Sequence, residues 1–152
     1  MNYKLRNATQ PKNVETCLED ILTLRGVEDI DSFLNPTKDC ELNPFNLDNI
    51  EAGATMLLKH LNNNSKICFI VDSDADGFTS SAILWNYIKS LFPEANLHFT
   101  VHDHKQHGLS DKIEWLTDVE QFDLVICPDS ASYDVVYHEQ LQEVNTDCLV
   151  LD

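Results

Sequence analysis

Four short apolar runs in the second half of the chain constrain the fold more than any other feature. The runs are KICFIV (66–71), LHFTV (97–101), DLVIC (123–127) and DCLVL (147–151). The first run is short and rich in β-branched residues, which is typical of a strand buried on both faces of a sheet. Helical patterns separate the four runs, in FTSSAILWNYIKSLF, LSDKIEWLTDV and SYDVVYHEQLQEV. This alternation predicts an α/β fold, a Rossmann-like parallel sheet of at least four strands with crossover helices.

The first part of the chain has a different pattern. Residues 14–25 carry apolar side chains at helical spacing, and Gly26 follows them as a stop signal. A short helix is expected in EDIDSFL, before Asn35-Pro36, and a longer one in NLDNIEAGATMLLKHL. We therefore expect a helical lead-in over residues 1–64 and a separate α/β part over residues 65–152.

Charge and cysteine content narrow the classes of function. The chain has 26 acidic and 10 basic residues, a formal net charge of −16, which disfavours gripping a phosphate backbone and fits binding of divalent metals. Its five cysteines are scattered without a CxxC pair, so we expect free thiols in a reducing, cytoplasmic environment. No apolar stretch of the sequence is long enough to span a bilayer, and no membrane partner is expected.

Aspartates gather where the predicted strands end. The stretch IVDSDADGFTSS (70–81) places Asp72, Asp74 and Asp76 after the first run, and Asp129 and Asp152 follow the third and fourth. One aspartate at such a position is typically a helix cap or turn former. The ends of parallel strands share one edge, however, and crowded carboxylates repel one another unless a cation lies between them. The pattern therefore predicts a site for Mg²⁺ or Mn²⁺, the ions that prefer oxygen ligands.

Two other motifs fit the same stretch less well. An EF-hand loop that began at Asp72 would need glutamate where Ile83 stands and a helix where the strand pattern lies, so it is excluded. A haloacid-dehalogenase-type phosphatase matches Asp72 and Asp74, but such sites normally carry Thr or Val where Asp76 stands. It remains a minor alternative.

Several motifs together resemble the DHH phosphoesterases, and in particular the RecJ-type single-strand-specific exonucleases. DSDADGFTSS resembles the D-x-D-x-D-G-x-T-S motif, and LRGVEDIDSFLNP resembles the lead-in before it. QHGLS (106–110) stands where the subfamily has a G-Y-G-L turn, and FDLVICPDSAS where it has an apolar strand ending in D-x-G. CLVLD ends on what resembles the first letter of the D-H-H motif, so the resemblance runs from about Leu18 to Asp152.

The resemblance implies a phosphodiesterase that holds two Mn²⁺ or Mg²⁺ ions and degrades single-stranded DNA from its 5′ end, in DNA repair and recombination. Carried over to this chain, the metal ligands are Asp74, Asp76 and Asp129. Asp129 also bridges the two ions, and Asp72 and Asp152 support the catalytic site from beside or behind.

The resemblance also implies a rim that contacts the substrate. Its members are Thr79, Ser80, His107 and Gly108. Gly77 is expected to turn the backbone sharply after the first strand, and Thr79 and Ser80 to open the following helix.

The chain departs from the family pattern at several positions. Gln106 and His107 replace the first glycine and the tyrosine of the turn, and Ala131 replaces the D-x-G glycine, which removes backbone freedom beside Asp129. The sequence does not contain the His-His pair expected after Asp152, the next metal-binding aspartate or the C-terminal substrate-binding domain. We therefore expect an incomplete domain that lacks its C-terminal part, is inactive by itself, and binds single-stranded DNA weakly or not at all.

Other interpretations stay open. One is a phosphodiesterase of the same superfamily acting on oligonucleotides or cyclic dinucleotides, against which the RecJ-like lead-in argues. Another is a non-catalytic acidic binding protein that retains half of the fold, which the net charge of −16 favours. The segment LHFTVHDHKQHGL contains four histidines, but no cysteine is nearby, so we expect polar loop residues near the substrate rather than a zinc site.

Overall fold

The structure is a computed structural model, and it describes residues 13–102, 106–119 and 121–152. The chain divides into two compact units, one up to Asn46 and one from Leu47 to Asp152. No helix among these described residues combines the length and apolar character needed to cross a membrane. The assignment of residues 65–152 to a phosphoesterase domain stays a prediction.

The unit up to Asn46 contains short helical segments. These are α1 (Val14–Leu24), α2 (Ile30–Leu34) and the 3₁₀ turns η1 (Lys38–Cys40) and η2 (Pro44–Asn46). Asn13 caps α1, since its Oδ1 accepts a hydrogen bond from the Thr16 backbone N–H at 2.8 Å. Gly26 follows the helix with φ of +81°, as its predicted role as a stop signal requires.

The unit from Leu47 is built on a four-stranded sheet with the order β2-β1-β3-β4, and all its strands are parallel. The strands are β1 (Ile67–Val71), β2 (Leu97–Val101), β3 (Leu124–Cys127) and β4 (Asp147–Val150). The helices are α3 (Ile50–Asn62), α4 (Ala75–Leu91), α5 (Val135–Glu143) and a π-helical turn (Trp115–Val119). The predicted Rossmann-like α/β fold is confirmed.

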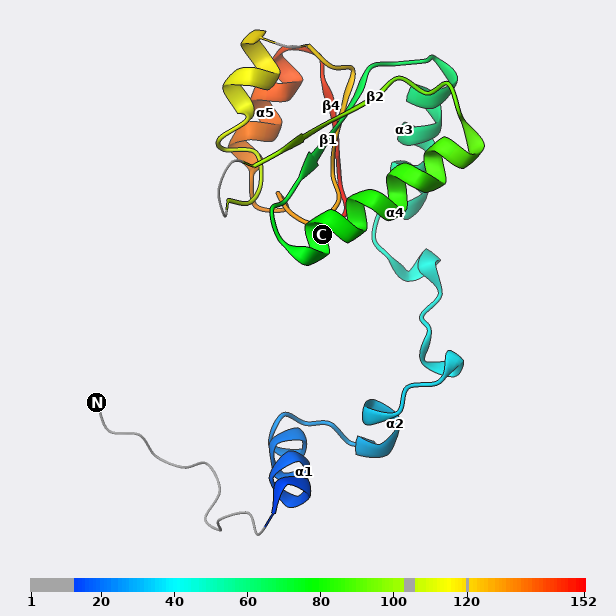
Figure 1. Cartoon of the computed structure of the whole chain (residues 1–152), viewed down its shortest axis with the longest axis vertical. Helices are drawn as coiled ribbons and strands as arrows, with labels where there is room; N and C mark the ends of the chain where they lie inside the picture. The colour runs from blue at the N-terminus through cyan, green and yellow to red at the C-terminus, as the bar shows by residue number, and fades with distance from the viewer. Residues whose placement is uncertain (1–12, 103–105, 120) are drawn as a thin grey trace, which may run out of the picture. The chain divides into compact units, whose positions relative to one another are not determined.

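Helices cover both faces of the sheet, with α5 on one side and α3 and α4 on the other (Figure 1). The α5 face buries Cys68, Ile70, Val125 and Cys127 against Leu116 and Leu141. The opposite face buries Phe69, Val71, Leu124 and Ile126 against Leu61 and Ile88. Alternate residues of β1 and β3 therefore enter different cores, which explains why these two strands contain no charged residue.

Helix α4 begins earlier than the sequence pattern predicted. Asp74 is its N-cap, and its Oδ1 accepts a hydrogen bond from the Gly77 N–H at 3.2 Å. Gly77 thus lies inside the first helical turn, and the sharp turn predicted at this residue is wrong. Thr79 and Ser80 do not open the helix either. Their hydroxyls donate to carbonyl oxygens of the preceding turn, those of Ala75 at 2.8 Å and Gly77 at 3.2 Å.

Candidate metal centre

The carboxyl ends of the strands bring polar residues from four parts of the chain to one edge of the sheet. Asp72 directly follows β1, and His102 directly follows β2. Asp129 comes two residues after β3, and Asp152 two residues after β4. Because the strands are parallel, these positions share one edge although the sequence separates them widely.

Three carboxylates form a compact cluster at this edge. Asp74, Asp76 and Asp129 each offer one oxygen atom, and these atoms all lie within 4.8 Å of one another. Asp74 is the N-cap of α4 and Asp76 lies in its first turn, so the helix start fixes both. Carboxylate oxygens are preferred ligands of hard divalent cations, so these three residues are a candidate site for one such ion.

The electrostatic environment of Asp129 also favours a cation at this cluster. Partial burial raises the pKa of this carboxyl above its ordinary value, and the negative charges of Asp76, Asp74, Asp72 and Asp152 raise it further. A bound cation would reverse the unfavourable interaction among these charges. A divalent ion bound at the cluster would therefore relieve a repulsion that the fold itself creates.

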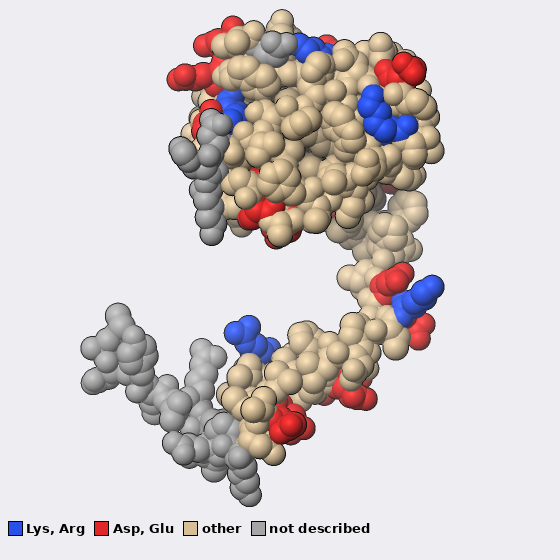
Figure 2. Space-filling model, viewed as in Figure 1, with Lys and Arg blue, Asp and Glu red and all other residues tan. Residues whose placement is uncertain are grey.

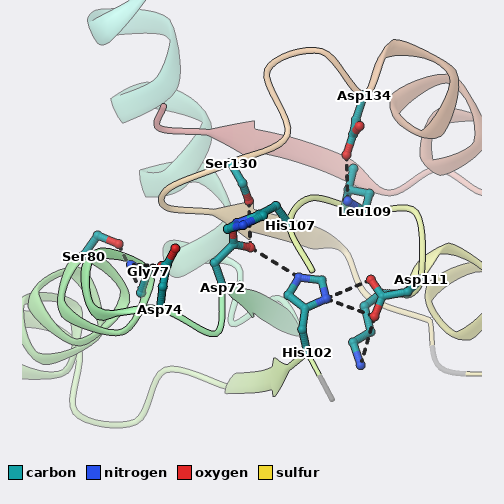
Figure 3. A network of polar contacts seen from close by, with 11 residues as sticks. Asp72, Asp74, Gly77, Ser80, His102, His107, Leu109, Asp111, Ser130 and Asp134 are labelled. Carbon is teal, nitrogen blue, oxygen red and sulfur yellow. Dashed lines mark hydrogen bonds and ion pairs between the residues drawn. The ribbon is translucent and has the colours of Figure 1, made fainter. Parts of the chain in front are cut away.

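Asp72 has a different environment from the other aspartates. It is only 1% exposed, and other side chains occupy both of its oxygens (Figure 3). Oδ1 accepts a hydrogen bond from Ser130 Oγ at 3.0 Å, and Oδ2 lies 2.6 Å from His107 Nδ1. Asp72 thus supports the loops that carry the cluster, and it is not one of the three clustered carboxylates.

The segment 106–110 is held by the start of α5. The Leu109 N–H donates to Asp134 Oδ2 at 2.7 Å, and Gly108 is buried with φ of +77°. A Cβ atom at residue 108 would overlap the same Asp134 oxygen, so a larger residue would have to displace this carboxylate as well as adopt a positive φ that favours glycine. This anchor places the half-exposed ring of His107 against Asp72.

The other predicted site residues lie around the cluster. Asp152 is exposed, and its Oδ2 accepts a hydrogen bond from the Ser132 N–H at 3.4 Å. Thr79 is exposed and Ser80 is half-buried, on the first turns of α4. Their roles toward a substrate, like that of Gly108, stay predictions.

His102 corrects the expectation that the histidines are polar loop residues. Its side chain is fully buried, its Nδ1 lies 2.8 Å from Asp111 Oδ1, and its Nε2 lies 3.3 Å from Asp72 Oδ1. The second contact is within ion-pair distance but is not aligned as a hydrogen bond. His98 is exposed and bonded to Asn96, whereas His104 lies outside the described residues.

Sequence reasoning did not identify Ser130, Asp111 or Asp134, and the only signal for Ser130 is its position beside Asp129.

Comparison with known proteins finds relatives that are named as exonucleases. No protein-family model matches the chain. Proteins from Bacillus subtilis (strain 168) and Bacillus phage SPbeta, both named as the single-strand DNA-specific exonuclease YorK, are 42% identical to it over 135 residues. The alignment covers 89% of this chain and 23% of each YorK protein.

A second relative is more distant. The single-stranded-DNA-specific exonuclease RecJ of Bacillus subtilis (strain 168) is 23% identical over 155 residues, which covers 98% of this chain and 19% of RecJ. The chain therefore spans less than a quarter of the length of the YorK and RecJ proteins that it matches.

Proposed function

We propose that this chain supplies part of the metal centre of a RecJ-like DHH phosphoesterase that cleaves single-stranded DNA from its 5′ end. The observation that carries the proposal is the cluster of Asp74, Asp76 and Asp129 at the carboxyl edge of a parallel sheet. The similarity of the chain to proteins named as single-strand DNA-specific exonucleases supports the choice of single-stranded DNA as the substrate.

The three clustered carboxylates would hold Mn²⁺ or Mg²⁺, and the complete centre would hold two ions. When bound, such ions lower the pKa of a coordinated water and neutralise charge on the phosphate. Within the chain, Asp74 and Asp76 fix ligand oxygens to the first turn of α4, and Asp129 brings a third oxygen from the β3 loop. Asp72 would support the centre by accepting from the Ser130 hydroxyl, and Asp152 by accepting from the Ser132 N–H.

Contacts to DNA would depend on the metal more than on basic side chains. On the face of the Leu47–Asp152 unit seen in Figure 2, Lys and Arg atoms form separate small groups rather than a continuous patch. With a net charge of −16, the chain repels a phosphate backbone unless cations neutralise its carboxylates. We therefore expect weak binding that requires the divalent ion, with Thr79, Ser80, His107 and Gly108 at the rim.

Nuclear magnetic resonance tests this proposal, because it detects weak binding. With Mg²⁺ present, a single-stranded oligonucleotide with a 5′ phosphate should shift the amide signals of residues 74–80 and 107–109. The shifts should disappear without Mg²⁺ and in Asp129→Asn, and they should persist in Glu139→Gln, which removes an exposed charge on α5. Shifts that are absent, or that do not depend on the ion and on Asp129, would contradict the proposal.

The same titration separates the alternatives. A cyclic dinucleotide that shifts the same signals at lower concentration than the DNA would favour a phosphodiesterase of small nucleotides. We also expect no hydrolysis of 5′-phosphorylated single-stranded DNA by this chain alone, because three carboxylates supply too few ligands for two ions. Robust Mn²⁺-dependent degradation that Asp74→Ala abolishes would contradict that expectation.

A further inference from the structure

The buried carboxylate of Asp72 connects the two loops that carry the metal cluster. It lies in the same short loop as Asp74 and begins the stretch that enters α4. Its Oδ1 accepts a hydrogen bond from Ser130, the residue that directly follows Asp129. The position of Asp72 therefore sets the distance between the carboxylates of the α4 start and the carboxylate of the β3 loop.

Two histidines hold Asp72, and they differ in exposure. The His107 side chain is 52% exposed and faces Oδ2, whereas the His102 side chain is 0% exposed and faces Oδ1 at 3.3 Å (Figure 3). His102 is itself fixed, because its Nδ1 lies 2.8 Å and 3.0 Å from the two oxygens of Asp111. Both ring nitrogens of His102 thus face carboxylates, Nδ1 within hydrogen-bond distance of Asp111 and Nε2 at 3.3 Å from Asp72 without hydrogen-bond alignment.

We propose that His102 is a positioning residue of the metal centre, which acts through Asp72 to fix the spacing of Asp74, Asp76 and Asp129. This inference rests on the proposed metal centre and adds a residue that contacts neither the ion nor the substrate. The imidazole links the end of β2 and the Asp111 turn to the Asp72 carboxylate, which Ser130 connects in turn to the loop after β3. Partners that orient metal ligands from behind typically change metal affinity by about 10- to 100-fold when they are removed.

Mn²⁺ binding by the full chain, measured from the electron paramagnetic resonance signal of free Mn²⁺, tests this role without any need for activity. His102→Leu should weaken Mn²⁺ binding by about tenfold, and His102→Gln, which keeps an N–H donor, by less than about threefold. The matched control is His98→Leu in β2, the strand that leads to His102, at an exposed residue bonded to Asn96, and it should bind Mn²⁺ like the wild type.

A double-mutant cycle shows whether His102 acts through Asp72. In an Asp72→Asn background no buried charge is left without its partner, so His102→Leu should fold even if the single variant does not. There it should change Mn²⁺ affinity by less than about twofold, since coupled residues are non-additive. A tenfold loss in that background would overturn the proposed route through Asp72.

The possible results distinguish a failure of the His102 proposal from a failure of the proposed metal centre. If wild type binds Mn²⁺ and folded His102→Leu binds it equally well, the role of His102 is wrong and the metal centre stands. If wild type binds no Mn²⁺, the metal centre of the proposed function fails, and the role of His102 fails with it.

Discussion

Gly77 packs directly against Asp72. A Cβ atom at residue 77 would lie 2.6 Å from the Asp72 Cβ and 2.7 Å from its carbonyl oxygen, closer than such atoms approach in proteins. The first turn of α4 can therefore lie beside the end of β1 only because residue 77 has no side chain. This contact explains the glycine of the D-x-D-x-D-G pattern by close approach rather than by a turn.

Gly77→Ala should destabilise the protein by about 1–3 kcal/mol, because the added methyl group meets backbone that cannot move aside. Urea denaturation measures the difference in unfolding free energy. The matched control is Gly53→Ala in α3, where the nearest atom is a side-chain methyl of Leu149 at 3.1 Å and helix propensity favours alanine by about 1 kcal/mol. Equal stabilities of Gly77→Ala and wild type would refute the close-approach explanation.

Ala131→Gly should have the opposite effect. Ala131 adopts φ of +81°, a left-handed conformation that costs an alanine about 1–2 kcal/mol. Burial of its methyl group stabilises the folded state by only about 0.8 kcal/mol. Glycine at residue 131 should therefore raise the unfolding free energy by up to about 1 kcal/mol.

Ala95→Gly is the control for that change, since Ala95 is equally buried and has no positive φ. It should lower the unfolding free energy by about 1 kcal/mol, because it removes a buried methyl group and gives the unfolded chain more freedom. If the two glycine substitutions destabilise the protein alike, residue 131 is not strained.

The fold was predictable from the sequence because its signals are local. Each strand is an apolar run, and a parallel sheet necessarily brings Asp72 and Asp129 to one edge. The support of the site depends on contacts between residues distant in sequence, and local patterns do not contain them. His102 looked like a loop residue because its partner Asp72 lies 30 positions before it. Gly77 was misread because a glycine after a strand suggests a turn as readily as a close contact.

Asp129 makes stability depend on pH in a defined direction. Its pKa in the folded protein is raised above the ordinary value of 3.8, so the folded state holds this proton more tightly than the unfolded state. The stability that comes from this tighter proton binding is fully present below the pKa of Asp129 in the unfolded state. It is lost as pH rises through the pKa of Asp129 in the folded state. At neutral pH without metal the ionised carboxyl destabilises the fold, and Asp129→Asn should raise the unfolding free energy.

The gain from Asp129→Asn should shrink as pH falls toward 3.8, which urea denaturation over a pH series detects. Titration of the Asp129 carboxyl carbon by nuclear magnetic resonance should give a midpoint above 3.8 in the folded protein. Glu139→Gln, an exposed change on α5, should have little effect at any pH. A midpoint below 3.8 would contradict the crowding of charges around Asp129.

The melting temperature with and without Mn²⁺, measured for wild type and Asp76→Asn, tests the metal centre most directly. An ion at about ten times its Kd stabilises the folded state by roughly 1.4 kcal/mol, and the melting temperature of a domain of this size then rises by several degrees. Asp76→Asn should abolish that rise. It should also melt higher than wild type without metal, because Asp76 is the charge that most raises the Asp129 pKa. If wild type ignores Mn²⁺ and Asp76→Asn melts lower in its absence, the aspartates are structural caps and the metal centre is wrong.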